Sequence, residues 1–257
     1  MTPKSEPDAL SYMGSVLAYM VTEEYDAAIN DLNEVIRLEP NNASAFALRG
    51  DAYLKNGQFD EAIVDFTEAI RLDPNNVDAY KSRGNAYMVK FQLDEALSDL
   101  SEAIRLDPNN ASAYKIRGEA YGLQLQFDDA ISDLGEAIRL DPKDASAYET
   151  RGLAYKVKGQ YDDVINDYSE VIRLDSNNAD AYKERGDAYA LLGKYDAAIN
   201  DFTEVIRLDP NDADAYGFRG QAYRFLGQKN QAILDFEKAL SLDTALDWVR
   251  QELEEMR

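Results

Sequence analysis

Two charged columns recur along the sequence every 34 residues, and they are the residues best suited to chemistry. Arginine precedes glycine at Arg49-Gly50, Arg83-Gly84, Arg117-Gly118, Arg151-Gly152, Arg185-Gly186 and Arg219-Gly220. Aspartate recurs at Asp31, Asp65, Asp99, Asp133, Asp167, Asp201 and Asp235. Because a guanidinium group binds a carboxylate bidentately, the arginines could form a carboxylate-recognition array. We favour the simpler interpretation that the two columns pair with each other between helices.

The composition argues against several classes of catalytic and metal site. The chain has no cysteine and no histidine, which removes thiolate nucleophiles, imidazole bases, disulfides and the common zinc sites. Residues 209–214 place oxygen-bearing side chains at alternating positions, as an EF-hand calcium loop does. Asp214 stands where that loop needs glycine, so we interpret these residues as a turn between helices. No signal places two carboxylates in an apolar pocket. We therefore expect no enzyme activity, no metal and no cofactor.

Hydrophobic periodicity within one 34-residue unit predicts helices. In the second unit an amphipathic stripe is formed by Ala62, Ile63, Phe66, Ala69 and Ile70. Asp60 precedes this stripe as the predicted N-cap, and Pro74 ends the helix. The corresponding predicted N-caps are Asp26, Asp94, Asp128, Asp162, Asp196 and Asn230. A helical glycine costs about 1 kcal/mol relative to alanine, so the recurring glycine predicts a close approach between helices.

Further columns complete the repeat. One aromatic column is Tyr12, Phe46, Tyr80, Tyr114, Tyr148, Tyr182 and Tyr216, and a second is Tyr19, Tyr53, Tyr87, Tyr121, Tyr155, Tyr189 and Tyr223. Alanine, a large apolar residue and proline follow in most units. Over residues 9–244 this pattern resembles the tetratricopeptide repeat. Because a unit of this length cannot bury its own apolar face, neighbouring units must share a core.

The resemblance implies an all-α, right-handed α-solenoid superhelix of seven helix-turn-helix repeats. The repeats would start near residues 9, 43, 77, 111, 145, 179 and 213. A leader would occupy residues 1–8, and a C-terminal capping helix would occupy residues 245–257 with an apolar stripe of its own.

The resemblance also implies a concave groove lined mainly by the first helices. Its candidate partner-binding residues are Asp51, Lys81, Asn85, Lys115, Glu119, Glu149, Lys183, Asp187, Gln221 and Arg224. The lysines would meet acidic groups of a partner, and the carboxylates would meet basic ones. Lys81 and Asn85 match the opening pair of the family's carboxylate clamp. Glu119 and Glu149 depart from the clamp pattern, so we do not assign one.

Two departures from the repeat are candidate sites at the edges. Phe91 and Leu125 stand in the third and fourth units where four other units carry the turn glycines Gly57, Gly159, Gly193 and Gly227. We expect these two side chains to pack across neighbouring turns, and the alternative is an exposed interaction patch. The single tryptophan, Trp248, lies off the stripe of the last helix, so it would contact another molecule, such as a second copy, or be partly buried on the scaffold edge.

These observations predict a non-catalytic protein–protein interaction scaffold or adaptor that binds a peptide or protein segment in the groove. A net charge of −22 repels phosphate backbones, so we expect no nucleic-acid partner. No apolar run reaches membrane-spanning length, and we expect a cytoplasmic protein. The alternatives are a homo-oligomerising assembly scaffold that uses the repeat edges and the C-terminal helix, and an engineered, consensus-like repeat protein without a natural partner.

The charge balance gives a first testable prediction. Screening of like charges should raise the melting temperature when salt increases from about 0.01 M to about 0.15 M. Thermal denaturation followed by circular dichroism measures this shift, and a fall in melting temperature over that range would contradict the prediction.

Overall fold

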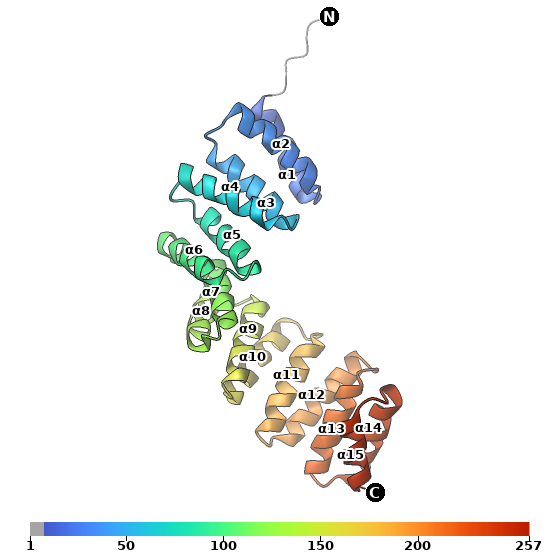
Figure 1. Cartoon of the computed structure of the whole chain (residues 1–257). Coiled ribbons are helices and arrows are strands. Elements are labelled where there is room, and N and C mark those ends of the chain that lie inside the picture. Colours follow the sequence, from blue (N-terminus) through green and yellow to red (C-terminus); the bar gives the residue numbers. More distant parts are fainter. Residues whose placement is uncertain (1–7, 257) are drawn as a thin grey trace, which may run out of the picture. The chain divides into compact units, whose positions relative to one another are not determined.

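The computed structural model describes residues 8–256, which form fifteen α-helices and no β-strand (Figure 1). The leader predicted for residues 1–8 lies outside the described residues apart from Asp8, which caps the first helix. No helix in residues 8–256 combines the length and the apolar character that crossing a membrane requires.

The helices fall into two compact units, which are described separately. The first unit contains α1 (Ala9–Val21), α2 (Tyr25–Leu38), α3 (Ala43–Lys55), α4 (Phe59–Leu72), α5 (Val77–Val89), α6 (Leu93–Leu106), α7 (Ala111–Leu123) and α8 (Phe127–Leu140). The second unit contains α9 (Ala145–Val157), α10 (Tyr161–Leu174), α11 (Ala179–Leu191), α12 (Tyr195–Leu208), α13 (Ala213–Phe225), α14 (Lys229–Leu242) and α15 (Asp247–Met256).

Within each unit the helices form successive pairs. Each odd-numbered first helix packs on the second helix that follows it, and this second helix packs on the next first helix. First helices also contact each other directly, α3 with α5, α5 with α7, and α11 with α13, more closely than second helices do. The first helices therefore line the inner face of each unit. The predicted all-α repeat fold is confirmed.

The helix starts follow two different rules. Polar residues before the first helices act as N-caps: the side chain of Asn76 accepts a hydrogen bond from the backbone N–H of Ala79 at 2.9 Å. The N-caps predicted for the second helices are wrong. Helix α4 begins at Phe59 after Gln58, and Asp60 lies inside its first turn. An acidic side chain there still interacts favourably with the positive end of the helix dipole.

The recurring glycine allows the two helices of a repeat to approach closely. A Cβ atom at any of the six glycines of the Arg-Gly pairs would lie 2.8 to 3.1 Å from an apolar side chain of the second helix in the same repeat. At Gly118 this neighbour is Leu134, and the carbonyl oxygen of Ala130 lies 3.2 Å away. The packing role predicted for the glycine is therefore confirmed.

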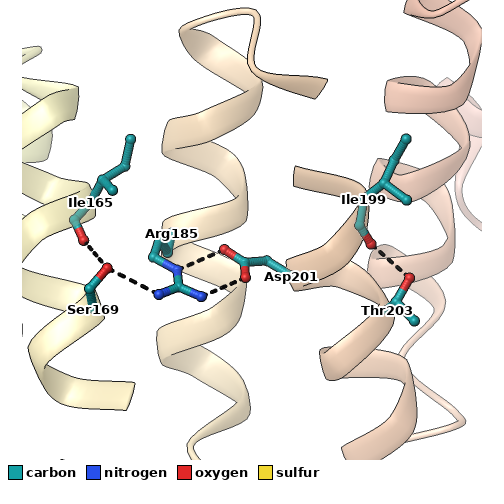
Figure 2. A network of polar contacts seen from close by, with 6 residues as sticks. All are labelled: Ile165, Ser169, Arg185, Ile199, Asp201 and Thr203. Carbon is teal, nitrogen blue, oxygen red and sulfur yellow. Dashed lines mark hydrogen bonds and ion pairs between the residues drawn. The ribbon is translucent and has the colours of Figure 1, made fainter. Parts of the chain in front are cut away.

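The arginine beside each glycine pairs with the aspartate of the same repeat. Figure 2 shows Arg185 with Asp201, whose carboxylate oxygens accept hydrogen bonds of 2.9 and 2.7 Å. A further guanidinium nitrogen of Arg185 donates to the Ser169 hydroxyl at 3.0 Å. Its guanidinium carbon lies 5.6 and 5.9 Å from the ring centroids of Tyr182 and Tyr189, within cation–π range. The hydrogen bond to Asp201 raises the pKa of Arg185, while burial acts in the opposite direction.

The turn inside each repeat needs one residue in the left-handed region. Gly57, Gly159, Gly193 and Gly227 have φ angles of 71 to 76°. Phe91 and Leu125 occupy the same position with φ of 57 and 61°, and Glu23 of the first repeat does so with φ of 61°. A side chain at such an angle costs about 1–2 kcal/mol per residue, which glycine avoids. The first, third and fourth repeats therefore keep a strained turn, and in the third and fourth the strained residue is a large apolar one.

Helix α15 continues the packing of the repeats. Val249 and Leu253 are buried against α14. Trp248 stacks on Phe218 with ring centroids 5.3 Å apart. A Cβ atom at Gly217 would lie 2.8 Å from the Trp248 ring, so the absence of a side chain at Gly217 makes room for the indole. Trp248 is therefore partly buried on the scaffold, and its contact with a second copy stays a prediction.

The Arg–Asp pairing can be tested by a double-mutant cycle on Arg117 and Asp133, whose closest contact is 2.6 Å. Either single substitution to alanine should cost about 3 kcal/mol of unfolding free energy, because it leaves a poorly hydrated charge unpaired. Removing both side chains should cost less than the sum of the two single substitutions, with a coupling free energy of at least about 1 kcal/mol. Chemical denaturation measures all four proteins. A matched cycle with Asp99, which pairs with Arg83 instead, should give a much smaller coupling. Equal coupling in the two cycles would refute the assigned pairing.

Two glycines on α7 give a matched test of the close approach. Gly118→Ala should lower the unfolding free energy by about 1–3 kcal/mol, because the added methyl group overlaps Leu134. Gly122→Ala should raise it by about 0.5 kcal/mol, since nothing lies within 4 Å of the new Cβ atom and alanine restricts the unfolded chain. Urea denaturation of both variants measures the difference. A stabilised Gly118→Ala variant would contradict the packing role.

Candidate functional site

The candidate groove residues all lie on first helices, and in the second unit charged side chains of these helices bridge successive repeats. The Lys156 ammonium group on α9 lies 2.6 Å from the Glu184 carboxylate and 3.8 Å from the Asp187 carboxylate, both on α11. Burial opposes the charge of Lys156, but the hydrogen bond to Glu184 raises its pKa. This cation is therefore held between two carboxylates of the next repeat.

The next repeat places Lys183 in a similar setting. Its ammonium group lies 3.4 Å from the Asp212 carboxylate and 3.7 Å from that of Asp214. Both aspartates belong to the start of the following repeat, and Asp212 also caps α13. Lys183 thus contributes to the joint between repeats.

Arg224 repeats this arrangement once more. Its guanidinium group contacts the carboxylate of Glu252 and lies 2.9 Å from that of Glu255, both on α15. The three cations Lys156, Lys183 and Arg224 therefore each face two carboxylates, which leaves an excess of negative charge around each one. Glu149 is also engaged, because it accepts a hydrogen bond of 2.9 Å from the Asn178 side chain.

A cavity of about 470 Å³ opens between the helices of the last repeats in the second unit. Leu191 and Phe225 lie on its wall, although 59% and 58% of their surfaces remain exposed. The Phe225 ring stacks on Tyr195 at a centroid separation of 4.8 Å and an interplanar angle of 7°. Asp187 and Gln221 are the candidate residues that line the cavity. The site is thus largely apolar with a few polar groups, as ligand pockets commonly are.

The two polar candidates at the cavity differ in their surroundings. Burial raises the pKa of the Asp187 carboxyl, and the charge of Lys156 acts in the opposite direction. Gln221 makes no side-chain hydrogen bond to any residue in 8–256, so its amide can offer both a donor and an acceptor to a ligand. The cavity therefore combines apolar surface with one uncommitted amide.

The candidates of the first unit lie on α3, α5 and α7. Burial raises the pKa of Asp51, and a hydrogen bond with Ser82 of the next repeat lowers it. Lys81 pairs at 2.6 Å with Asp78 of its own helix. Asn85 makes no side-chain hydrogen bond within the described part of the chain. Lys115 and Glu119 are both engaged with neighbouring groups.

The structure does not support the expected packing of Phe91 and Leu125 across neighbouring turns. Both side chains are 74% exposed. The left-handed turn that carries them leaves little neighbouring surface for either side chain to cover.

Residues 209–214 form an ordinary repeat turn. The Asp209 carboxylate accepts the backbone N–H of Asn211 at 2.9 Å, and that of Asp212 accepts the backbone N–H of Ala215 at 2.8 Å. These side chains therefore serve the turn and the N-cap.

Sequence reasoning missed the residues that wall the cavity. Leu191 and Phe225 belong to a 34-residue column that also contains Val89, Leu123 and Val157, at the end of successive first helices. All five side chains are at least 43% exposed. Apolar residues at a solvent-facing position were a visible signal, because they lie outside the packing stripe.

Comparison with known proteins agrees with this architecture. A family model described as TPR repeat matches residues 17–57, 50–90, 126–159 and 152–193, and models described as Tetratricopeptide repeat match residues 77–110, 179–212 and 213–245. No curated protein matches the sequence.

Solved structures of repeat proteins share the fold. The crystal structure of YrrB, a TPR protein with an unusual peptide-binding site, has a TM-score of 0.69 at 22% identity, over 74% of this chain and 97% of that one. A tetratricopeptide repeat protein from Parabacteroides merdae has a TM-score of 0.64 at 22% identity, over 96% and 98%. The C-terminal part of a repeat protein from Cytophaga hutchinsonii reaches 0.79 at 19% identity, over 93% and 98%.

The helix pairs, the packing columns and the family models lead to one assignment. The chain belongs to the tetratricopeptide repeat family, whose repeats form scaffolds for protein–protein interaction.

Proposed function

We propose that this protein is a non-catalytic scaffold that binds a segment of a partner protein on the first-helix face of its second unit. The observation that carries the proposal is the cavity beside Leu191 and Phe225. Its volume lies within the range of about 300–1,000 Å³ that is typical of ligand sites, and it has room for an aromatic or large aliphatic side chain of a partner.

The energetics favour an apolar anchor at this position. Leu191 and Phe225 are more than half exposed without a partner, so covering them removes apolar surface from water. The stack with Tyr195 fixes the Phe225 ring before binding, which reduces the entropy lost on association. Anchoring side chains of this kind usually dominate binding energy.

The uncommitted amide of Gln221 supports recognition of a polypeptide. An extended segment presents backbone N–H and C=O groups, and one glutamine side chain can bond to both. YrrB, which shares the fold, is described as having a peptide-binding site. The identity between the two chains is too low to transfer its residues, so this likeness supports only the kind of ligand.

The charged candidates take a smaller part in this proposal than the sequence suggested. Lys183 and Arg224 are each flanked by two carboxylates of the chain itself, so an acidic partner would have to displace an existing ion pair. We therefore assign these two cations to the joints between repeats. Contacts of a partner with Lys81, Lys115 and the carboxylates of the face remain predictions, as does a cytoplasmic location.

The proposal predicts that Phe225→Ala weakens peptide binding by about tenfold, because the anchor loses one wall of its cavity. Gln221→Ala should weaken it by a few-fold and leave the melting temperature unchanged, since the amide makes no hydrogen bond within the chain. Peptides selected from a displayed random library on the full chain serve as probes, and fluorescence anisotropy measures their affinity.

Leu234→Ala is the matched control for this experiment. Leu234 is 66% exposed on the second helix α14 of the same unit, away from the cavity. Its substitution should leave the affinity unchanged. Selected peptides that bind all variants equally would contradict the proposed face, and a library that yields no binding peptide would contradict peptide binding itself.

A further inference from the structure

A second surface of the protein lies at the turns between the helices of the third and fourth repeats. Phe91 and Leu125 are both strained and exposed there. We propose that these turns bind a basic segment of another protein through two of its large apolar side chains. This site belongs to the first unit and does not depend on the cavity of the second.

The backbone of the turn does not require the side chains that it carries. In the second repeat Gln58 donates its backbone N–H to the carbonyl of Tyr53 at 2.8 Å, with Gly57 between the helices. Gln92 makes the same bond to Tyr87 at 2.9 Å, with Phe91 in the place of the glycine. The turn is thus equally well formed with glycine, which adopts this conformation without strain.

Burial within the chain does not compensate for the strain. Phe91 and Leu125 are 74% exposed, so they gain little from packing on residues 8–256. A bulky residue in the left-handed region is uncommon, and strained positions often mark functional sites. Here the strain and the exposed apolar surface coincide at equivalent positions of two successive repeats.

The two turns are neighbours, joined by a side-chain hydrogen bond. The Gln124 side chain, beside Leu125, donates to the Asp94 carboxylate at 2.8 Å. Asp94 follows Phe91 by three residues, so this bond ties the fourth turn to the third. Val89 and Leu123 lie two residues before the strained positions and are 43% and 48% exposed. We call these four side chains, Val89, Phe91, Leu123 and Leu125, the turn patch.

The charge around the turn patch selects its occupant. Exposed acidic residues fill the first turns of the adjoining second helices, and they are Asp94, Glu95, Asp128 and Asp129. The cation of the third turn, Lys90, already contacts Asp60. A second copy of this chain, with a net charge of −22, would bring acidic groups against acidic groups. A basic segment complements both the apolar patch and its rim.

The test uses the double variant Phe91→Gly, Leu125→Gly of the full chain. Because glycine holds this position in four of the other turns and adopts the conformation without strain, the variant should melt at the same temperature as the original chain or a few degrees higher. The probes are three fluorescein-labelled pools of short peptides. One is basic with two leucine or phenylalanine residues, one is basic with serine at those positions, and one is acidic with the apolar residues.

We expect the basic apolar pool to bind at least about tenfold more tightly than either other pool at physiological ionic strength. The double glycine variant should lose this preference. Two control variants should retain the preference for the basic apolar pool. Val64→Ser replaces an apolar side chain that is 66% exposed on α4, and Phe225→Ala lies in the other unit.

Several results would overturn the proposal. These are equal binding of the acidic pool, equal binding by the double glycine variant, or no binding of any pool. Light scattering measures the oligomeric state of each protein. If the original chain is a dimer and the double glycine variant alone is a monomer, the turn patch binds a second copy instead. Loss of binding in Phe225→Ala alone would assign the peptides to the cavity instead.

Discussion

The close approach between the two helices of each repeat governs the rest of this structure. It depends on a position without a side chain, because a Cβ atom at Gly50 would lie 2.8 Å from the Phe66 ring. The neighbours in sequence of these two residues are Arg49 and Asp65, so the same approach brings a guanidinium group onto a carboxylate. Packing and ion pairing are thus two consequences of one contact, which explains why Arg-Gly and Asp-apolar recur as fixed pairs. A substitution at the glycine or at the arginine would therefore disturb both the helix packing and the ion pair.

Repetition of this contact determines which positions remain free for function. Residues next to it are committed to the core, and the inner faces of the first helices carry the variation. In the second unit many of those positions are also committed, since Lys156 and Lys183 each join successive repeats through two carboxylates. Variation within a repeat column therefore does not by itself indicate a binding residue. The exposed apolar positions are more informative, because the scaffold gains nothing from exposing them.

Much of the fold could be predicted from the sequence, because each signal is repeated. Spacing alone predicted the helix pairs, the role of Gly118 and the Arg–Asp pairing. The starts of the second helices were not predicted correctly, since Asp60 is a favourable residue both at an N-cap and in the first turn, and local propensity does not separate the two. The partners of Lys183 and Trp248 depend on side-chain contacts between neighbouring repeats. A single repeat column contains no information about such contacts.

The turn patch and the cavity rest on different physical arguments. At the cavity, the stack of Phe225 on Tyr195 is compatible with a stable scaffold, so binding and stability need not conflict. At Phe91 and Leu125, glycine would serve the turn better, and the side chains present there expose apolar surface as well. A feature that lowers stability without improving the packing is hard to explain by the scaffold. Recognition by a partner gives those side chains a role. Their burial in the complex would offset the free energy of the strained backbone.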